Sequence, residues 1–448
     1  MNELVQNELK KIFDQRFSTS ESTRANYARG EDTYDPVLSQ AVVFPESNEE
    51  VSKILKLCNE HKIPVVPFGT GTSLEGNVLG NENGITISLE KMNKILNVNV
   101  SDFDCRVQAN VTRKQLNEYL REDGVFFPID PGADAALGGM SATSASGTMA
   151  VKYGTMRTVV SGLTVVLPTG DIVKLGTRTK KSSAGYNLTN LFIGSEGTLG
   201  IVTRAILKLS PEPRQQLTAL LAIRDASGLV KLATKLRAEG GEFLSAMEFF
   251  SDVGLGIALE NIPGLVFPLQ GRASFYLLIE AGSGSMQVPL DQIISGVMEW
   301  GMDEGIVADG ALAKSEAQRA VFWRLREEQP EGQRRLGAQL KHDLSVPPSQ
   351  LGDFLDCANN LCSEVLKEVT INAFGHLGDG NVHYNLSPPL GQGDFSSLDH
   401  EFSIKLGRLA TIMGGSFAAE HGLGRTKIVL ADSLLIILFH FQDLFYYY

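Results

Sequence analysis

The side chains best suited to bind a metal ion are concentrated in two short segments near the C-terminal end of the chain. The first carries His376 and His383 on either side of Asp379-Gly380. Asp-Gly is typical of a two-residue hairpin turn, which would place His376 directly opposite His383 with their Cβ atoms about 5 Å apart. A shift of one residue would separate them onto opposite faces. The pattern predicts two imidazoles that can bind one ion.

The second segment, Glu420-His421-Gly422, supplies a carboxylate. Two histidines and one carboxylate with open positions can bind Zn²⁺, Mn²⁺ or Fe²⁺. We expect a short strand over residues 416–419, and consecutive strand residues point to opposite faces. Glu420 and His421 therefore reach one site only if the chain bends, which Gly422 allows. The alternative is that these are structural histidines in turns; we favour the metal site because the chain has only 7 histidines.

Two cations could bind an anionic substrate. Arg326 lies in an expected helix, and Lys341 follows in a strand-like run. The guanidinium of Arg326 can bind a carboxylate through two parallel hydrogen bonds, and Lys341 can add a compact second charge. On statistics alone, both are better interpreted as solvated surface cations.

Three glycine-rich segments in the N-terminal half could surround a long anionic cofactor. They span residues 67–77, 131–147 and 193–202. Backbone N–H groups without side-chain cover can bind a pyrophosphate, and Thr and Ser hydroxyls add donors. The first segment is not a Rossmann fingerprint, because Leu74 occupies the third glycine position, and it lacks the Gly-Lys-Ser/Thr of a P-loop. A tight connection or a linker would explain one such segment, but three in one domain favour a cofactor.

The elements that position these segments follow from the apolar pattern. Ser47 and Glu50 form a capping box at the start of a helix between two strands, as in an α/β domain. From residue 85 to about 210 the pattern of short strands separated by small residues is typical of an α+β fold. Residues 1–17 have helical spacing, which places Leu4, Leu9, Ile12 and Phe13 on one side of an expected helix. The expected strands in this half are residues 41–45, 63–68, 85–89, 105–109, 162–167, 172–174 and 200–209.

The motif Pro211-Glu-Pro213 is the expected domain boundary. Beyond it, strands over 217–223 and 275–281 and helices over 228–238 and 290–300 predict a second sheet covered by helices. A length of 448 residues accommodates two or three domains. We expect a first domain over 1–213, a second over 214–410, and a C-terminal segment, 411–448, that returns to the first.

Charge and composition exclude several classes of protein. The formal net charge of −12 leaves no basic stripe for nucleic acid. The four cysteines form no C-x-x-C pair, so reduced thiols are expected. The N-terminus has no signal or transit pattern, and no apolar run could span a bilayer. We expect a cytoplasmic protein, with peripheral membrane attachment as an alternative.

Four motifs carry a resemblance to a known family: VVPFGTGTSLEGN, FFPIDPGADAALGGMSATSASG, VKYGTMR and IGSEGTLGIVT. Residues 26–213 closely resemble the FAD-binding domain of the vanillyl-alcohol oxidase/p-cresol methylhydroxylase superfamily. Within it they look most like the FAD-linked, cytochrome-type D-lactate dehydrogenases, with the glycolate oxidase and D-2-hydroxyglutarate dehydrogenase families close by. The resemblance implies an α+β fold, in which a two-subdomain FAD-binding domain of the p-cresol methylhydroxylase type precedes a ferredoxin-like α+β substrate (cap) domain.

The resemblance also implies a set of FAD contacts. Residues 69–73 would hold the pyrophosphate, and the second and third segments would line the flavin. Some relatives attach FAD through a histidine in the first loop; residues 67–77 contain none, so the FAD should be non-covalent. The expected cofactor-binding residues are Pro67, Gly69, Thr70, Gly71, Thr72, Ser73, Gly76, Asn77, Pro131, Gly132, Gly138, Gly139, Ser141, Ser144, Gly147, Gly154, Glu196, Gly197, Ile201 and Val202.

The resemblance continues through GHLGDGNVHYN and EHGLGR to about Lys427. It implies that His376, His383 and Glu420 bind a divalent metal, Zn or Mn, and that His421 is the acid/base residue. It also implies that Asn385 contacts metal or substrate, and it favours the substrate-binding interpretation of Arg326 and Lys341.

The implied reaction is oxidation of a small D-2-hydroxy acid, with D-lactate first, by hydride transfer to FAD. The alternatives are D-2-hydroxyglutarate or glycolate as substrate or, in a different class, a non-catalytic flavin- or metal-binding protein. Electrons would pass to a cytochrome, an electron-transfer flavoprotein or a quinone, and a homodimer is expected. After Lys427 the chain departs from the family. The end, IVLADSLLIILFHFQDLFYYY, is apolar and aromatic, and we interpret it as an abnormal terminus that replaces the family's closing segment.

Overall fold

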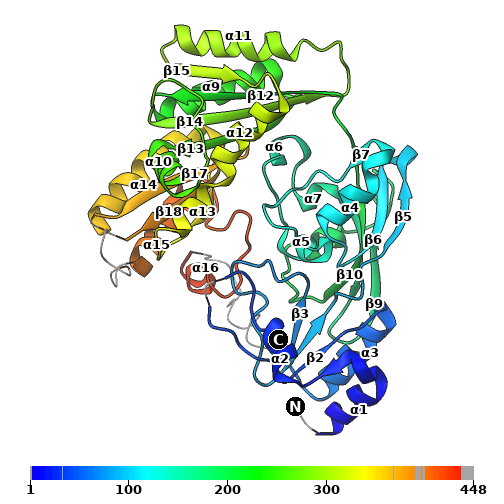
Figure 1. The fold of residues 1–448 in the computed structure, drawn as a ribbon. Coiled ribbons are helices and arrows are strands. Elements are labelled where there is room, and N and C mark those ends of the chain that lie inside the picture. Colours follow the sequence, from blue (N-terminus) through cyan, green and yellow to red (C-terminus); the bar gives the residue numbers. More distant parts are fainter. Residues whose placement is uncertain (1–2, 33, 367, 389–394, 396–398, 435–448) are drawn as a thin grey trace. The chain divides into compact units, whose positions relative to one another are not determined.

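The computed structural model describes residues 3–32, 34–366, 368–388, 395 and 399–434 (Figure 1). The chain divides into two compact units. Unit 1 comprises residues up to Gly147, residues Gly154–Glu212, and the chain from Glu420 onward; unit 2 comprises Thr148–Tyr153 and Pro213–Ala419. After Gly154, the chain passes from unit 1 to unit 2 between Glu212 and Pro213, which is within the motif Pro211-Glu-Pro213. The return to unit 1 begins at Glu420.

The N-terminal part of unit 1 is a four-stranded sheet in the order β1-β2-β4-β3. Strands β2, β4 and β3 are parallel, and β1 is antiparallel to β2 at the edge. Helix α1 buries Val5, Leu9 and Phe13, which are spaced four residues apart along one face. Leu4 and Ile12, which were expected on the same side, are 57% and 40% exposed beside that stripe.

Helix α3 begins as the sequence predicts, at an N-cap on Ser47 whose side chain accepts a hydrogen bond from the Glu50 N–H. The second half of the capping box differs. The Glu50 carboxylate accepts from the Glu46 N–H rather than from Ser47, and it forms an ion pair with Arg16 at 2.6 Å. The pair ties α3 to the segment that precedes β1.

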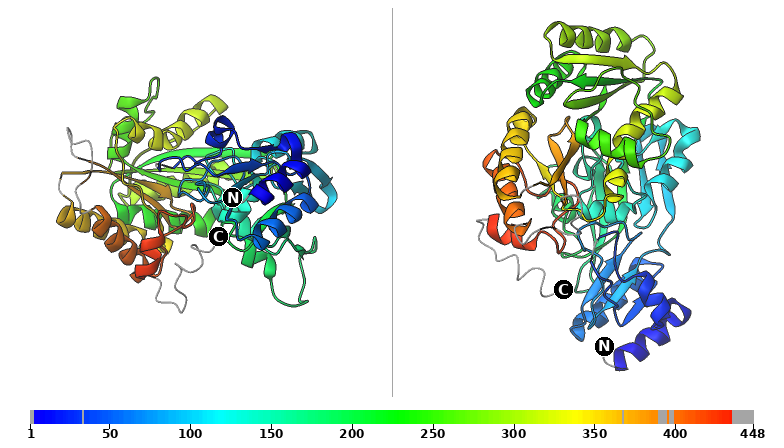
Figure 2. Two further views of the ribbon diagram at one scale, coloured as in Figure 1. Left: turned by 90° about the horizontal axis from the view of Figure 1, so that it is seen from below. Right: turned by 60° about the vertical axis from the view of Figure 1, so that its left-hand side comes forward.

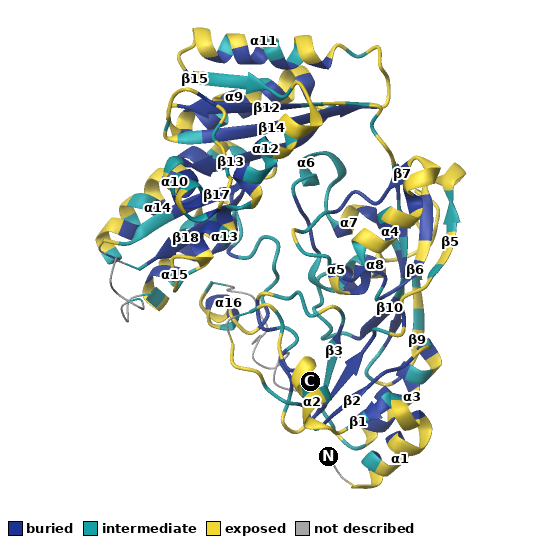
Figure 3. Cartoon of the chain, viewed as in Figure 1, coloured by how far each residue is buried: buried dark blue, intermediate teal, exposed yellow. Residues whose placement is uncertain are grey.

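The rest of unit 1 is a five-stranded antiparallel sheet in the order β5-β6-β10-β8-β9, together with a two-stranded pair of β7 and β11. Each expected strand of this half forms, with ends shifted by about two residues at most. Strand β5 was not expected. Figure 3 shows the outer strands β5 and β9 largely coloured as intermediate or exposed, whereas β6, β8 and β10 contribute to a buried core.

The helices and strands of unit 1 have the following bounds: α1 Glu3–Phe13, β1 Phe17–Ser18, α2 Glu21–Asn26, β2 Ala41–Val43, α3 Asn48–Glu60, β3 Val65–Phe68, β4 Ile85–Ser88, β5 Ile95–Asn99, β6 Asp104–Gln108, α4 Arg113–Leu120, β7 Val125–Phe126, α5 Leu137–Thr143, α7 Met156–Val159, β8 Val160–Val166, β9 Ile172–Gly176, α8 Leu188–Phe192, β10 Ile201–Lys208, β11 Ser210–Pro211 and α16 Ile428–Leu434.

Unit 2 is built on a seven-stranded antiparallel sheet in the order β15-β12-β14-β13-β17-β18-β16. Helices cover both faces. Helix α9 packs against α11 and α14 on one face, and α12 lies over β12, β13 and β14 on the other (Figures 1 and 2). Every residue of β13 is buried as a result, and Figure 3 shows the central strands in the buried colour. The expected second sheet covered by helices is therefore present.

The helices and strands of unit 2 have the following bounds: α6 Ala150–Tyr153, β12 Gln215–Ile223, α9 Ala226–Gly240, β13 Leu244–Ser251, α10 Asp252–Asn261, β14 Phe275–Ser283, α11 Leu290–Asp303, β15 Val307–Leu312, α12 Glu316–Glu327, α13 Gln329–Arg334, β16 Asp343–Ser345, α14 Leu351–Val365, β17 Thr370–His376, β18 Asn381–Ser387 and α15 Asp399–Ile412.

Two further expectations can be compared with the structure. All four cysteines are free, and only Cys357 is exposed. Among the described helices, none combines the length and the apolar character needed to cross a membrane. The apolar end of the chain beyond Leu434, on which we based the interpretation of an abnormal terminus, lies outside the described residues.

Candidate active site

The hairpin of β17 and β18 presents both expected histidines, but its register differs from the predicted one. His383 is opposite Phe374, and His376 is opposite Asn381. The turn comprises residues 377–380 and not the Asp-Gly pair alone. Gly380 has a positive φ (+82°), but Asp379 does not. A two-residue type I′ turn needs positive φ at both positions. The slip is by two residues, so the imidazoles keep a common face, with ring centroids 5.6 Å apart.

Each imidazole has a buried carboxylate beside its Nδ1 atom. The Nδ1 of His376 lies 2.7 Å from an oxygen of Glu248. The Nδ1 of His383 lies 3.8 Å from an oxygen of Asp343, its neighbour across the β16–β18 pair. Both carboxylates are buried (0% and 3% exposed). A carboxylate at Nδ1 favours the tautomer whose Nε2 carries the lone pair that a metal ligand needs.

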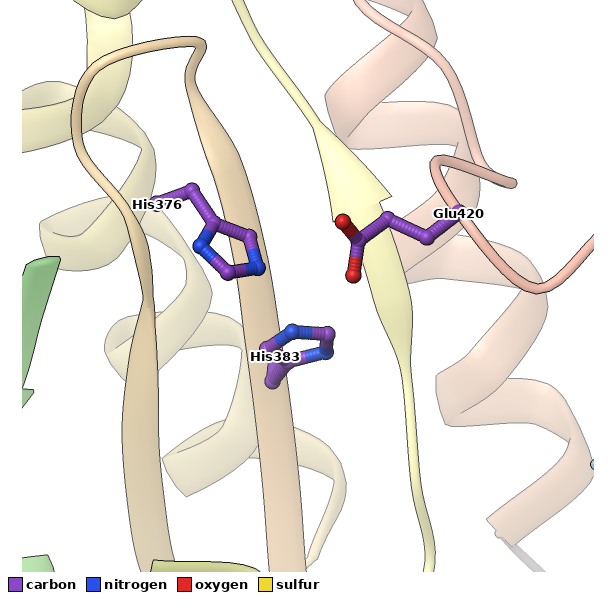
Figure 4. A group of neighbouring side chains, drawn as sticks. All are labelled: His376, His383 and Glu420. Atoms are coloured by element: carbon purple, nitrogen blue, oxygen red, sulfur yellow. The ribbon is translucent and has the colours of Figure 1, made fainter. Parts of the chain in front are cut away.

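Glu420 directly follows Ala419, the last residue of unit 2, whose N–H donates to the Asp343 carbonyl. Ligand atoms of His376, His383 and Glu420 all lie within 4.8 Å of one another. Figure 4 shows the carboxylate and the two imidazoles turned toward each other. The expected strand over residues 416–419 is wrong: only a single bridge forms there, between Ser345 and Ser416. Two N and one O donors at this spacing fit a divalent ion such as Zn²⁺.

The chain bends after Glu420 as expected, since Gly422 has a φ of +82°. Within unit 1, the Ser146 hydroxyl donates to the Glu420 carboxylate at 2.7 Å. The next residue, His421, places its Nδ1 3.6 Å from the Glu75 carboxylate. Glu75 also forms an ion pair with Lys427 at 3.0 Å, and both of these side chains are 8% exposed.

Two carboxyl groups near this bend have pKa values shifted in opposite directions. Burial would raise the pKa of Glu75, but the hydrogen bond from His421 and the charge of Lys427 outweigh it, so the pKa is lowered. Burial raises the pKa of Glu196 despite hydrogen bonds from the Leu423 and Gly424 N–H groups. Glu75 is therefore held as the ionised partner of Lys427.

The three glycine-rich segments converge in unit 1. The Thr70 hydroxyl accepts from the Ala136 N–H, which joins the first segment to the second. The second joins the third through N–H bonds from Gly194 and Glu196 to the carbonyls of Ser141 and Ala142. The side chain of Asn77 donates to Glu196, which joins the first segment to the third. Their convergence makes a single backbone-lined site possible.

The backbone of these segments fits a large cofactor. Gly71, Gly76, Ser144, Glu196 and Gly197 all have positive φ, as in backbone turns that expose N–H groups. A Cβ atom built on Gly132 or Gly139 would meet nothing within 4 Å, so both face open space. Unit 1 therefore offers the bare, connected backbone that FAD requires.

Several expected cofactor contacts also have packing roles. The Ser141 hydroxyl donates to the Leu137 carbonyl, and a Cβ on Gly138 or Gly147 would clash with Ala109 or Asp130. The side chains of Ile201 and Val202 belong to hydrophobic cores, so only their backbone could reach a cofactor. The remaining residues lie in or beside the converging loops: Pro67, Gly69, Thr72, Ser73, Pro131 and Gly154.

The two expected substrate cations differ in their environments. Arg326, on α12, is only 6% exposed; its Nε lies 3.0 Å from Glu248, and its guanidinium lies 4.8 Å from the Phe374 ring centre. It is not a solvated surface cation. Lys341 is exposed and precedes β16 instead of lying in a strand. Asn385 is buried on β18, on the same face as His383, and accepts from the His342 N–H.

Sequence reasoning missed the acidic partners. Glu248 was detectable in principle, because a single acid inside the apolar run Leu-Ser-Ala-Met-Glu-Phe-Phe is rarely buried without a partner. Asp343 lies two residues after Lys341, in the strand-like run expected there. Glu75 lies in a recognised motif and Lys427 at the end of the resembling region, but no sequence signal pairs residues so far apart in the chain.

Comparison with known families decides the kind of protein. Residues 39–176 match the family described as "FAD binding domain", and residues 212–433 match "FAD linked oxidases, C-terminal domain". The chain belongs to the FAD-linked oxidases. This FAD-linked oxidase is thus an oxidoreductase, and its family confirms the resemblance read from the motifs.

Relatives of this FAD-linked oxidase cover most of its length. A probable mitochondrial D-lactate dehydrogenase of Danio rerio is 37% identical, over 93% of this chain and 83% of that protein. The mitochondrial D-lactate dehydrogenase (cytochrome) of Arabidopsis thaliana is 34% identical over 94% and 73%. A D-2-hydroxyglutarate dehydrogenase of Xanthomonas citri is 34% identical over 86% and 81%. The cytoplasmic location expected for this chain stays a prediction beside these mitochondrial names.

Solved structures agree on the fold. The p-cresol methylhydroxylase structure with bound substrate aligns with a TM-score of 0.73 at 16% identity, over 97% of this chain and 92% of that one. An alkyldihydroxyacetonephosphate synthase aligns at 0.71 and 19% identity, over 97% and 83%. The predicted p-cresol methylhydroxylase type of FAD-binding fold is confirmed.

Proposed function

We propose that this FAD-linked oxidase converts a small D-2-hydroxy acid, with D-lactate as the first choice, to the 2-oxo acid. The observation that carries the proposal is the group His376, His383 and Glu420 in a chain with an FAD-binding domain. Oxidation of the substrate carbon needs an acceptor for two electrons, a base for the hydroxyl proton and a way to hold the carboxylate. FAD bound in unit 1 would accept the hydride.

The donor set would hold a divalent ion through His376, His383 and Glu420. Such an ion would polarise the substrate hydroxyl and lower its pKa. Glu248 and Asp343 would keep the imidazole rings oriented, and Ser146 would hold the Glu420 carboxylate by its hydrogen bond.

His421 would take the hydroxyl proton. Its Nδ1 faces the ionised Glu75, so its other nitrogen is the one that could face a substrate. A carboxylate behind an imidazole stabilises the cation that forms when the ring accepts a proton. Lys427 shares the same carboxylate and keeps it ionised.

Arg326 and Lys341 would bind the substrate carboxylate. No hydrogen bond joins the Nη atoms of Arg326 to another described residue, and its Nε is fixed against Glu248. The pair of Nη groups is the edge that a carboxylate could engage. Asn385, on the same face as His383, would contact the metal or the substrate.

D-2-Hydroxyglutarate is the second candidate, because relatives named for that activity are 34% and 35% identical to this chain. The deciding experiment is reduction of the bound flavin, followed by absorbance, with a panel of D-2-hydroxy acids that includes D-lactate, D-2-hydroxyglutarate and glycolate, each against its L-enantiomer where one exists. Rapid bleaching by D-lactate and not by L-lactate supports the proposal. Bleaching by no member of the panel contradicts it.

The metal is tested separately. Chelation with EDTA followed by gel filtration should lower turnover while the flavin absorbance stays, and Zn²⁺ or Mn²⁺ should restore activity. Metal-free protein that turns over at the full rate would show that the ligand assignment is wrong. We expect a cytochrome, an electron-transfer flavoprotein or a quinone as the acceptor; the name of the Arabidopsis relative specifies a cytochrome for that protein.

A further inference from the structure

Glu248 is a buried acid at the centre of the unit 2 sheet. It lies on β13, where every residue is buried, and its own exposed fraction is 0%. In the pairing of β13 with β17 it stands directly opposite His376. Side chains directly opposite in an antiparallel pair share a face and lie in contact. The acid and the proposed metal ligand are thus fixed to each other by the backbone.

The two oxygens of this carboxylate have different partners. One lies 2.7 Å from His376 Nδ1, and the other lies 3.0 Å from Arg326 Nε. The Arg326 N–H is not aligned with the oxygen, so this second contact is an ion pair and not a hydrogen bond. Phe374, the neighbour of His376 on the same face, supports the guanidinium plane. One buried acid therefore contacts two groups that the proposed function uses for different tasks.

The geometry defines what each contact does. A hydrogen bond from Nδ1–H of His376 to Glu248 leaves the Nε2 lone pair for a metal and fixes the ring plane. The charge of Glu248 holds the Nε edge of Arg326, so the Nη edge is directed away from the acid. Without the carboxylate, the ring could adopt the other tautomer and the guanidinium could rotate.

We propose that Glu248 is a positioning residue that orients His376 toward the metal and Arg326 toward the substrate carboxylate. The proposal rests on the proposed function, because it assigns Glu248 a role in that metal and substrate site. It predicts that a single substitution weakens two separate binding events.

Glu280 supplies a matched control. It is 4% exposed on the adjacent strand β14, and its carboxylate pairs at 2.6 Å with Arg319, which lies on the same helix as Arg326. It also accepts from Trp323 and Thr218. None of these hydrogen-bond and ion-pair partners among the described residues is a histidine. Glu248→Gln and Glu280→Gln therefore remove the same charge from the same sheet, but only the first touches the proposed ligand.

The first measurement is Zn²⁺ affinity of the FAD-containing full chain, by competition with a chromophoric chelator. We expect Glu248→Gln to bind Zn²⁺ about 10- to 100-fold more weakly, the usual effect of losing such a partner, and Glu280→Gln to bind like wild type. The KM for D-lactate should rise in Glu248→Gln alone. Flavin absorbance reports that unit 1 is folded. If Glu248→Gln does not fold, Glu248→Asp replaces it, since it keeps the charge beside Arg326 but is one methylene too short for His376.

The second measurement separates positioning from a general loss of stability. In a His376→Ala background, Glu248→Gln should have little further effect on Zn²⁺ affinity, whereas in a His383→Ala background its full effect should persist. Equal losses in the two backgrounds would overturn the proposal, as would wild-type Zn²⁺ affinity in Glu248→Gln. Either of these results leaves the proposed function standing. A wild-type chain that binds no metal would overturn the metal part of that function together with this inference.

Discussion

Glu75 and Lys427 form a buried ion pair whose contribution to stability depends on pH. The carboxylate is ionised because its contacts with His421 and Lys427 outweigh its burial. A carboxyl group with a lower pKa in the folded state stabilises the fold fully above its unfolded pKa, and this stabilisation is lost as the pH falls through the folded value. The pair should therefore stabilise unit 1 at neutral pH and lose this effect in acid.

Glu75→Gln leaves the buried Lys427 ammonium without its counter-charge. We expect the free energy of unfolding of unit 1 to fall by about 3 kcal/mol at neutral pH. The difference from wild type should shrink as the pH falls below 4.5, the ordinary pKa of the side chain. Urea unfolding followed through the flavin signal across this range measures both effects. The exposed Glu82→Gln is the control, and a difference that stays constant with pH would contradict the assignment.

His421 should be needed for turnover but not for the flavin. His421→Ala removes the proposed base, and loss of a general base commonly lowers the rate about 10²- to 10⁴-fold. Stopped-flow bleaching of the flavin by D-lactate measures the step directly, and the visible spectrum reports retained FAD. His400→Ala, an exposed histidine in α15, should react at the wild-type rate. Bleaching at the wild-type rate in His421→Ala would remove His421 from the mechanism.

At the scale of single elements, the hairpin β17–β18 depends on its turn. Gly380 has a φ of +82°, and a Cβ atom there would lie 1.9 Å from the Val346 carbonyl oxygen. Gly380→Ala therefore adds a clash to the usual cost of about 1–2 kcal/mol for a left-handed L-residue. We expect the melting temperature and the Zn²⁺ affinity to fall together, because the turn holds the strands that carry both histidines.

Gly305 is the matched control for this substitution. Its φ is +70°, but an added Cβ would meet nothing within 4 Å. Gly305→Ala should lower stability by the strain alone and leave Zn²⁺ affinity unchanged. If Gly380→Ala bound Zn²⁺ as tightly as Gly305→Ala does, the turn would not control the geometry of the two histidines.

The same hairpin shows how far the sequence could be read. A local signal was sufficient at the Ser47 N-cap, where a serine hydroxyl before a helix has one common use. The register was predicted wrongly because Asp-Gly is compatible with more than one turn, and the chain used Gly380 alone for positive φ. The shared face of His376 and His383 survived only because the slip was an even number of residues.

The partners of the functional groups could not be predicted from local patterns. Glu248 reaches His376 across 128 positions of sequence, and Asn77 reaches Glu196 across 119. Such contacts depend on strand order and on loop convergence, which the tertiary fold determines. The family resemblance located the functional segments, but the acids that hold them became visible only in the structure.

At the scale of the whole chain, FAD should be released by denaturation. The loop from Pro67 to Asn77 contains no histidine for a covalent link. Acid precipitation should leave a colourless pellet and yellow supernatant, and the supernatant should contain intact FAD by chromatography. Yellow colour that stays with the washed pellet would show a covalent attachment elsewhere. A denatured sample to which riboflavin is added before precipitation controls for flavin that is merely trapped in the pellet.

Unit 1 is assembled from three separate stretches of chain, and the last begins only at Glu420. A ribosome makes the chain from the N-terminus, at about 5–20 residues per second. All strands of the unit 2 sheet, of which β18 is the last in the chain and ends at Ser387, are thus made before the residues that contact Glu75 and Glu196. Until then the nascent flavin-binding part lacks the segment from Glu420 onward. A chaperone or an early supply of FAD would protect it while it is most exposed to aggregation.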